Sequence, residues 1–204
     1  MGSTESLGTK GVELSTLASA AAFRNMRSQG VEFVIMRGYQ SVGRVDPNLA
    51  TTVANAWDAG MSNVDVFQFP CFSCSNAAGQ ANTLISYMKD NAVKYGTVWL
   101  DVEGPGTYWG SNTSANAAFI ADWVQAMKDD GVNIGIYTSE SQWVPIVGSY
   151  TGGSTLPLWY THRDGKQNFD DFKPFSGWTK PDMKSYNDVV SQSGVGVTPI
   201  WNPR

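Results

Sequence analysis

Short apolar runs alternate with longer segments of helical period along most of the chain. The runs at 33–36 and 98–100 are continuously apolar, as expected of strands that are buried on both faces. The helical period is clearest over 115–129, where the apolar residues fall on one face. The predicted strands cover 11–15, 32–37, 63–69, 97–103, 133–137, 156–160, 184–187 and 196–200. The predicted helices cover 17–29, 48–59, 77–95 and 115–129.

This order gives about five strand–helix units, followed by three strands with little helix between them. From Glu140 onward the helical pattern thins out, and 148–154 and 167–177 have the Gly, Ser and Pro content of long loops. Eight strands in this order predict an α/β fold of one domain, an incomplete (β/α) barrel. A doubly wound open sheet is the alternative, but no G-x-G-x-x-G follows the first strand.

The amino-acid composition and the charge argue against several classes of function. The 204 residues are 42% hydrophobic and 16% charged, which is typical of a folded globular domain. The net charge of −4 and the absence of a Lys/Arg-rich run argue against a nucleic-acid partner. No apolar stretch approaches the roughly 20 residues that span a bilayer, so we expect no membrane insertion. The 12% of aromatic residues offers flat surfaces on which sugars or bases stack.

Histidine and cysteine are scarce. His162 is the only histidine, which excludes multi-histidine zinc sites, and its polar surroundings favour a solvated loop residue. Cys71 and Cys74 form a C-x-x-C motif with too few further ligands for zinc. We expect a disulfide that pins a strand-to-helix loop and indicates an oxidising compartment, while thiol redox chemistry stays open.

Two carboxylates stand out in the sequence VWLDVE at 98–103. Asp101 and Glu103 lie at i and i+2 of a buried strand and therefore share one face, about 6.5 Å apart along the backbone. Burying two like charges side by side raises at least one pKa. Glycoside hydrolysis uses such a pair, although this spacing decides neither retention nor inversion. The alternative is two solvated carboxylates at a strand end, each paired with a Lys or Arg.

Other residues gather at the same predicted end of the barrel, where reactive groups of this architecture lie. The carboxyl ends of the strands carry Glu13, Arg37, Tyr39, Asp65, Gln68, Tyr137, Trp159, Tyr160 and Thr198. Phe67 and Phe69 add further rings. Tyr108 and Trp109 follow the carboxylates in a Gly/Pro-rich loop, and we expect them to form a wall on which sugars stack.

Several motifs occur together in a familiar order. They are GVELS at 11–15, YQSVGRVD at 39–46, FPC at 69–71, WLDVE at 99–103, GIYT at 135–138, LPLWY at 156–160, PFSGW at 174–178 and GVGV at 194–197. In this order and spacing the chain, from about Lys10 to Pro203, resembles the glycoside hydrolase family 25 lysozymes. These are the Chalaropsis-type N-acetylmuramidases, and the likeness is greatest to their animal and amoebozoan members.

The resemblance implies an irregular TIM-like (β/α)5(β)3 barrel over 10–204. From the residues that precede it, we expect 1–9 to be a disordered leader or cloning remnant. It implies hydrolysis of the β-1,4 bond between N-acetylmuramic acid and N-acetylglucosamine in peptidoglycan or a related amino-sugar glycan. Glu103 would be the general acid, Asp101 would stabilise the acetamido group or the developing positive charge, and Glu13 would complete the catalytic set. The expected substrate-binding residues are Tyr39, Asp65, Phe69, Tyr108, Tyr137, Trp159, Tyr160 and Thr198.

The resemblance also sets the expected context. It implies no metal or cofactor, and we expect a monomer. The residues after Met1 lack the basic and apolar regions of a signal peptide, and NTS at 112–114 is one glycosylation sequon. Secretion, or a lysosomal or phagosomal location, therefore rests on the family and on Cys71 and Cys74.

The sequence departs from the family pattern at outer positions of the site. Glu13 and Thr198 stand where the family normally carries aspartates, and Pro199 follows Thr198. The glutamine or histidine that often precedes the aromatic residue of the seventh strand is also altered, to KSY at 184–186. Losing a carboxylate at Thr198 removes a repulsion that helps to keep Glu103 protonated. A catalytically impaired barrel, a pseudoenzyme that binds a glycan or a protein, is therefore the alternative to a working or weak muramidase.

Overall fold

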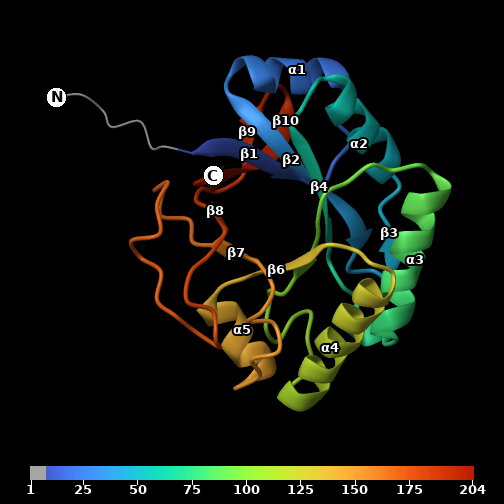
Figure 1. The fold of residues 1–204 in the computed structure, drawn as a ribbon, viewed down its shortest axis with the longest axis vertical. Coiled ribbons are helices and arrows are strands. Elements are labelled where there is room, and N and C mark those ends of the chain that lie inside the picture. Colours follow the sequence, from blue (N-terminus) through green and yellow to red (C-terminus); the bar gives the residue numbers. More distant parts are fainter. Residues whose placement is uncertain (1–7) are drawn as a thin grey trace.

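The computed structural model describes residues 8–204 and closes eight strands into a barrel (Figure 1). The strands of the ring are β1 (Thr9–Leu14), β2 (Val31–Gln40), β4 (Asn63–Gln68), β5 (Val98–Asp101), β6 (Ile134–Thr138), β7 (Leu158–Thr161), β8 (Met183–Ser185) and β10 (Val195–Asn202). Two short strands, β3 (Arg44–Val45) and β9 (Val190–Gln192), pair with β2 and β10. All eight predicted strands overlap strands of the ring, which confirms the predicted barrel.

The ring is closed by β1, which pairs with β2 on one side and with β10 on the other. The ring runs in the order β1, β2, β4, β5, β6, β7 and β8, and each strand is parallel to the next. The last strand, β10, is antiparallel to both β8 and β1. The pattern of apolar runs carried no signal for this reversal. It matters for the site, because β10 presents its residues in the opposite order along the barrel axis.

Helices cover part of the outside of the ring. They are α1 (Ala20–Ser28), α2 (Leu49–Asp58), α3 (Ala77–Asp90), α4 (Thr113–Asp129) and α5 (Glu140–Val147), with a short 3₁₀ turn, η1 (Phe72–Cys74). Figure 1 shows them following one another around the barrel from α1 to α5, while loops connect the orange and red strands after β7. This is the (β/α)5(β)3 arrangement that the resemblance implied.

Two helical expectations need correction. The helix predicted over 77–95 ends at Asp90, because the chain turns at Asn91 and Ala92 has a positive φ of 50°. The helix α5 had no predicted range, since Pro145 lies inside it and interrupts the helical pattern. Buried Trp143 and Ile146 hold this segment against the core, so packing outweighs the unfavourable proline.

Side chains fill the inside of the ring as a second core, separate from the one between strands and helices. Its members are Phe33, Ile35, Phe67, Trp99, Tyr137, Trp159, Met183 and Ile200. The Trp159 ring packs edge-on against Trp99 and Tyr137, with centroids 5.9 and 4.5 Å apart. Gly135 on β6 leaves the space that the Trp99 ring occupies. This aromatic filling separates the two ends of the barrel, so that chemistry at one end is isolated from the other.

The predicted boundary of the domain lies close to the start of β1. Thr9 already pairs with Asn202 of β10, one residue before the expected start at Lys10. The rest of the predicted leader, at 1–7, lies outside the described residues. Within 8–204, no helix is both long enough and apolar enough to cross a membrane.

A methyl group at Gly135 should destabilise the barrel, because it would overlap the Trp99 ring in a filled interior. Overpacking of this kind costs about 1–3 kcal/mol in the free energy of unfolding, and we expect Gly135→Ala to fall in that range. Urea denaturation monitored by tryptophan fluorescence measures the loss. Gly196→Ala on β10 is the matched control, since its methyl group would make only an ordinary contact with Val189. Equal stability of the two variants would contradict the packing described.

Candidate active site

A pocket of about 150 Å³ opens at the end of the barrel where β5, β6 and β7 end. Its lining residues are Glu13, Phe67, Asp101, Glu103, Tyr137, Trp159, Arg163, Val189 and Thr198. Six of these were predicted as site residues: Glu13, Asp101, Glu103, Tyr137, Trp159 and Thr198. The barrel therefore brings together residues that lie up to 185 positions apart, from Glu13 to Thr198.

Three of the lining residues are carboxylates. Asp101 is the last residue of β5, and Glu103 lies two positions beyond it on the same side of the chain. Glu13 comes from β1, where it lies opposite Thr198 of β10. Asp101 is only 5% exposed, and its Oδ1 atom is buried without a hydrogen-bond partner. A buried, unpartnered acceptor beside a pocket is well placed to bind an N–H or O–H donor of a ligand.

Burial and mutual repulsion raise the pKa values of these groups. Burial raises the pKa of Asp101 well above its usual value, and the nearby Glu103 and Glu13 raise it further. Burial also raises the pKa of Glu103, although a hydrogen bond with Asp101 and the charge of Arg163 act in the opposite direction. The pair therefore retains a proton at a pH where a solvated carboxyl has lost it.

Thr198 enters the pocket from the middle of β10 and not from its carboxyl end. The sequence interpretation placed it at a strand end, as for parallel strands, and this was wrong because β10 is antiparallel. Its side chain is buried and hydrogen-bonds to Glu13, which lowers the Glu13 pKa against the larger effect of burial. A neutral hydroxyl thus occupies the position next to Glu13.

Aromatic residues form the floor of the pocket. Tyr137 packs edge-on against Trp159, which in turn donates from Nε1 to Ser185 Oγ at 2.9 Å. Burial, followed by the charges of Glu103 and Asp101, raises the pKa of the Tyr137 phenol. This phenol therefore stays protonated and can donate a hydrogen bond into the pocket.

Five predicted site residues do not line this pocket: Asp65, Tyr39, Tyr160, Phe69 and Tyr108. Asp65 lies toward the opposite end of the barrel, where it accepts hydrogen bonds from Trp99 Nε1 at 2.9 Å and from the backbone N–H of Thr97. Tyr39 is buried in the outer core, beyond a register shift in β2. Tyr160 is also in the outer core and donates its hydroxyl to Asp171 at 2.7 Å.

The loop after Glu103 places its two aromatic residues differently. Tyr108 is 44% exposed and meets Phe69 edge-on, with ring centroids 4.7 Å apart. Trp109, expected as part of a sugar-stacking wall, is instead buried against Phe72 and Phe119, because the loop turns back onto α4. Its Nε1 donates to the Glu103 carbonyl at 3.1 Å, so Trp109 fixes the backbone of a site residue.

Arg163 and Val189 were missed by the sequence interpretation. Arg163 lies in the loop that follows β7 and hydrogen-bonds to Tyr137, and it forms an ion pair with Asp188 at 3.1 Å. Val189 is exposed at the pocket. Both lie in loops without periodicity. Only their positions, just after the sixth and the seventh predicted strands, could have indicated them.

Comparison with known proteins shows which family this chain belongs to. A family model described as Lysozyme-like protein 1 matches residues 4–186. The chain is 49% identical to probable GH family 25 lysozyme 2 of Dictyostelium discoideum, over 95% of this chain and 90% of the relative. It is 46% identical to probable GH family 25 lysozyme 4 of the same organism, with the same coverage. The chain belongs to the glycoside hydrolase family 25 lysozymes.

A solved structure supports the family 25 fold. The bacterial lysozyme from Streptomyces coelicolor superposes with a TM-score of 0.77, covering 97% of this chain and 93% of that one at 20% identity. Such a likeness at low identity shows that the barrel is retained while most side chains differ. The family model and the two relatives confirm the family 25 resemblance that the motifs indicated.

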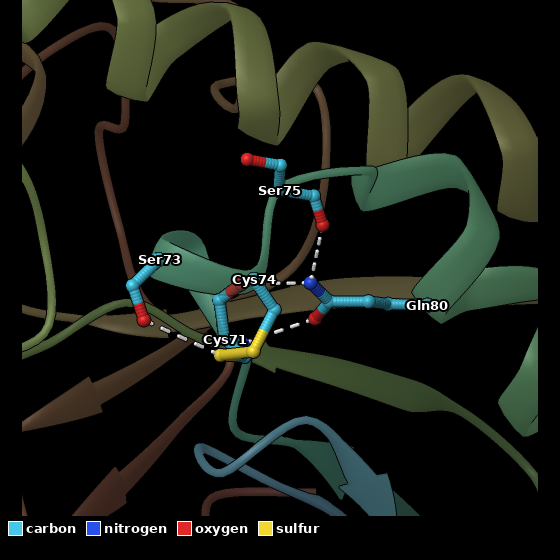
Figure 2. The surroundings of a disulfide bond; sticks show 5 residues. All are labelled: Cys71, Ser73, Cys74, Ser75 and Gln80. Carbon is cyan, nitrogen blue, oxygen red and sulfur yellow. Dashed lines mark hydrogen bonds between the residues drawn. A yellow bond between two sulfur atoms is a disulfide. The ribbon is translucent and has the colours of Figure 1, made fainter.

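The expected disulfide of this family 25 chain is present between Cys71 and Cys74. Figure 2 shows it in the turn between β4 and α3, with Gln80 of α3 reaching toward the turn. Gln80 accepts from the Cys71 N–H at 3.0 Å and donates to the carbonyls of Cys71 and Ser75. The bridge and the Gln80 side chain together fix the loop that follows Phe69.

A charged cluster lies behind the pocket, on the outer side of β8. Lys184 is fully buried, and its Nζ lies 3.0 Å from Asp164 and 2.7 Å from Asp171. His162, expected to be a solvated loop residue, is half exposed and also pairs with Asp171, at 2.6 Å. Hydrogen bonds from Lys184 and Tyr160 lower the pKa of Asp171 to about 2, against an opposing effect of burial. Lys184 thus supplies the positive charge that these carboxylates require.

Replacing Asp101 by asparagine should stabilise the protein at neutral pH. The folded Asp101 and Glu103 pair keeps a proton that the unfolded chain releases, so the free energy of unfolding falls as the pH rises from the ordinary carboxyl pKa to the raised one. Asp101→Asn removes that penalty. We expect a higher melting temperature than the parent at pH 7 and little difference at pH 3, measured by calorimetry.

The control is Asp58→Asn, which removes an exposed carboxylate paired with Arg24 at the outer helices. We expect this variant to show no gain that grows with pH. If Asp101→Asn melts at or below the parent temperature at pH 7, Asp101 is accommodated as a charge and the proposed proton is absent.

Proposed function

We propose that this chain hydrolyses the β-1,4 bond between N-acetylmuramic acid and N-acetylglucosamine in peptidoglycan. The observation that supports this most is the buried Asp101 and Glu103 pair, with raised pKa values, in the pocket of a family 25 barrel. Glycosidases need one protonated carboxyl near the leaving oxygen and one group that stabilises the cationic centre. This pocket offers both within one strand end.

Glu103 is proposed as the general acid. It is less buried than Asp101 and extends past the end of β5, so it can reach the glycosidic oxygen of a chain lying across the pocket. Its raised pKa keeps the proton that the leaving oxygen requires. The Trp109 hydrogen bond to the Glu103 carbonyl limits the movement of this acid.

Asp101 is proposed to stabilise the acetamido group or the oxocarbenium-like centre. Its unpartnered Oδ1 is an acceptor suited to the acetamido N–H, and it is close enough to Glu103 for their protons to be coupled. Glu13 adds a third carboxylate on the β1 side. Tyr137 would donate a hydrogen bond from the floor, and the Phe69 and Tyr108 pair would present aromatic faces at the rim.

The setting that we propose is secretion or a lysosomal or phagosomal compartment, with the chain acting as a monomer on bacterial wall or a related amino-sugar glycan. The Cys71–Cys74 disulfide favours an oxidising compartment. The net charge of −4 means that binding to an anionic wall relies on local contacts and not on a global field.

A second candidate function rests on Thr198. Where the family resemblance leads us to expect an aspartate, this neutral residue hydrogen-bonds to Glu13 and reduces the negative charge of the pocket. A barrel with this change could bind a glycan or a protein without cutting it. The two functions differ in turnover, which decides between them.

Glu103→Gln should lower the release of reducing ends from purified peptidoglycan at least about a hundredfold, because the general acid is lost. Release is measured across pH 3 to 8. Glu32→Gln, which changes an exposed glutamate on β2, is the matched control and should keep the parent rate. Activity that persists in Glu103→Gln would show that another residue is the acid, and no release by the parent at any pH would favour the binding function.

Thr198→Asp should extend activity to higher pH. An added carboxylate opposite Glu13 disfavours ionisation of the neighbouring carboxyls, so the general acid stays protonated at a higher pH. We expect the alkaline side of the pH–rate profile to move upward relative to the parent. Thr198→Asn, which adds similar volume without charge, should leave that side in place; equal profiles for both variants would exclude the electrostatic effect.

A further inference from the structure

Arg163 places a positive charge beside the carboxylates of the pocket. Among residues 8–204 it is the one cationic side chain that lines this pocket. Arg37, which also comes from a strand of the barrel, is bound to Asp46 at 2.7 Å and does not line it. The family motifs and the proposed hydrolysis give Arg163 no role.

The loop that carries Arg163 is held in place from both sides. The backbone N–H of His162 donates to Ser185 at 3.1 Å, and that of Gly165 donates to Tyr186 at 2.7 Å. Next to Arg163, Asp164 is bound by the fully buried Lys184. These contacts fix the backbone around Arg163, so the guanidinium is positioned at the pocket before any ligand arrives.

The present partner of Arg163 is easily displaced. Its ion pair with Asp188 joins side chains that are 41% and 79% exposed, and exposed pairs of this kind contribute little to stability. The Arg163 guanidinium also contacts Tyr137 on the pocket floor. A guanidinium matches a carboxylate through paired hydrogen bonds, so Asp188 occupies a position that a ligand carboxylate could take.

We infer that Arg163 binds a carboxylate on the muramoyl side of the glycan and thereby selects acidic amino-sugar substrates over neutral ones. This inference rests on the proposed function for its substrate class. The carboxylate has two sources with the same chemistry: the free lactyl group of a peptide-free sugar, or an acidic residue of an attached peptide. Neutral β-1,4 glycans of N-acetylglucosamine carry neither.

Binding of three ligands to the full chain tests this inference by calorimetry. The first is the disaccharide in which N-acetylglucosamine is linked to a terminal N-acetylmuramic acid, a bond that a muramidase does not cut. The second has its lactyl carboxyl reduced to an alcohol, and the third carries L-Ala-D-Glu on the lactyl group. We expect the parent to bind a carboxylate-bearing ligand about tenfold more tightly than the alcohol.

Two variants complete the design. Arg163→Gln should lose the discrimination, and Arg163→Lys should keep part of it. Arg24→Gln is the matched control, because Arg24 is another exposed arginine paired with an aspartate at 3.0 Å, and it should discriminate as the parent does. Preference for the first ligand alone identifies the lactyl group, whereas preference for the third identifies the peptide.

The outcomes separate this inference from the proposed function. Equal affinities for all three ligands, no binding of any, or unchanged discrimination in Arg163→Gln would each overturn the role of Arg163, even if the chain releases reducing ends from peptidoglycan. Discrimination that depends on Arg163 in a chain that releases no reducing ends would support carboxylate recognition and refute the hydrolase.

Discussion

Closure of the sheet through β1 is the constraint on which the site depends. Because β1 pairs with β2 on one edge and β10 on the other, the strand ends form one ring, and Glu13 lies opposite Thr198 and across from Asp101 in a shared pocket. In an open sheet, the first and last strands would lie at opposite edges. The aromatic filling lies beneath the pocket and adds to the burial that, with the repulsion between the carboxylates, raises the pKa of Asp101.

The pocket carries less negative charge than the family pattern leads us to expect. Three carboxylates remain, but a threonine replaces an expected fourth and Arg163 adds a positive charge. Both changes favour ionisation of Glu103, against the larger effect of burial, which favours the protonated form. For the general acid that we propose at Glu103, the depth at which the pair is buried would therefore set the pH range in which its proton is kept.

The side of the barrel without helices has its own support. Helices cover the first five units. The loops after β7 are instead fixed by Lys184, which is buried between Asp164 and Asp171. Because Lys184 is buried, a displaced loop would leave its charge unpaired away from water, and this cost favours the observed position of the loop. The loop is therefore rigid enough to carry Arg163 to the pocket.

The sequence by itself determined the barrel strands, four of the five helices, the disulfide and the Asp101 and Glu103 pair, because these depend on local periodicity and spacing. Tertiary structure alone decided the direction of β10 and the helix around Pro145, which nonlocal packing imposes. It also decided which predicted residues meet. Asp65 shares a strand with the pocket-lining Phe67, yet it lies toward the other end of the barrel. Arg163 reaches the pocket from a loop. Contacts between distant segments set both the depth of a residue along the barrel axis and the path of a loop.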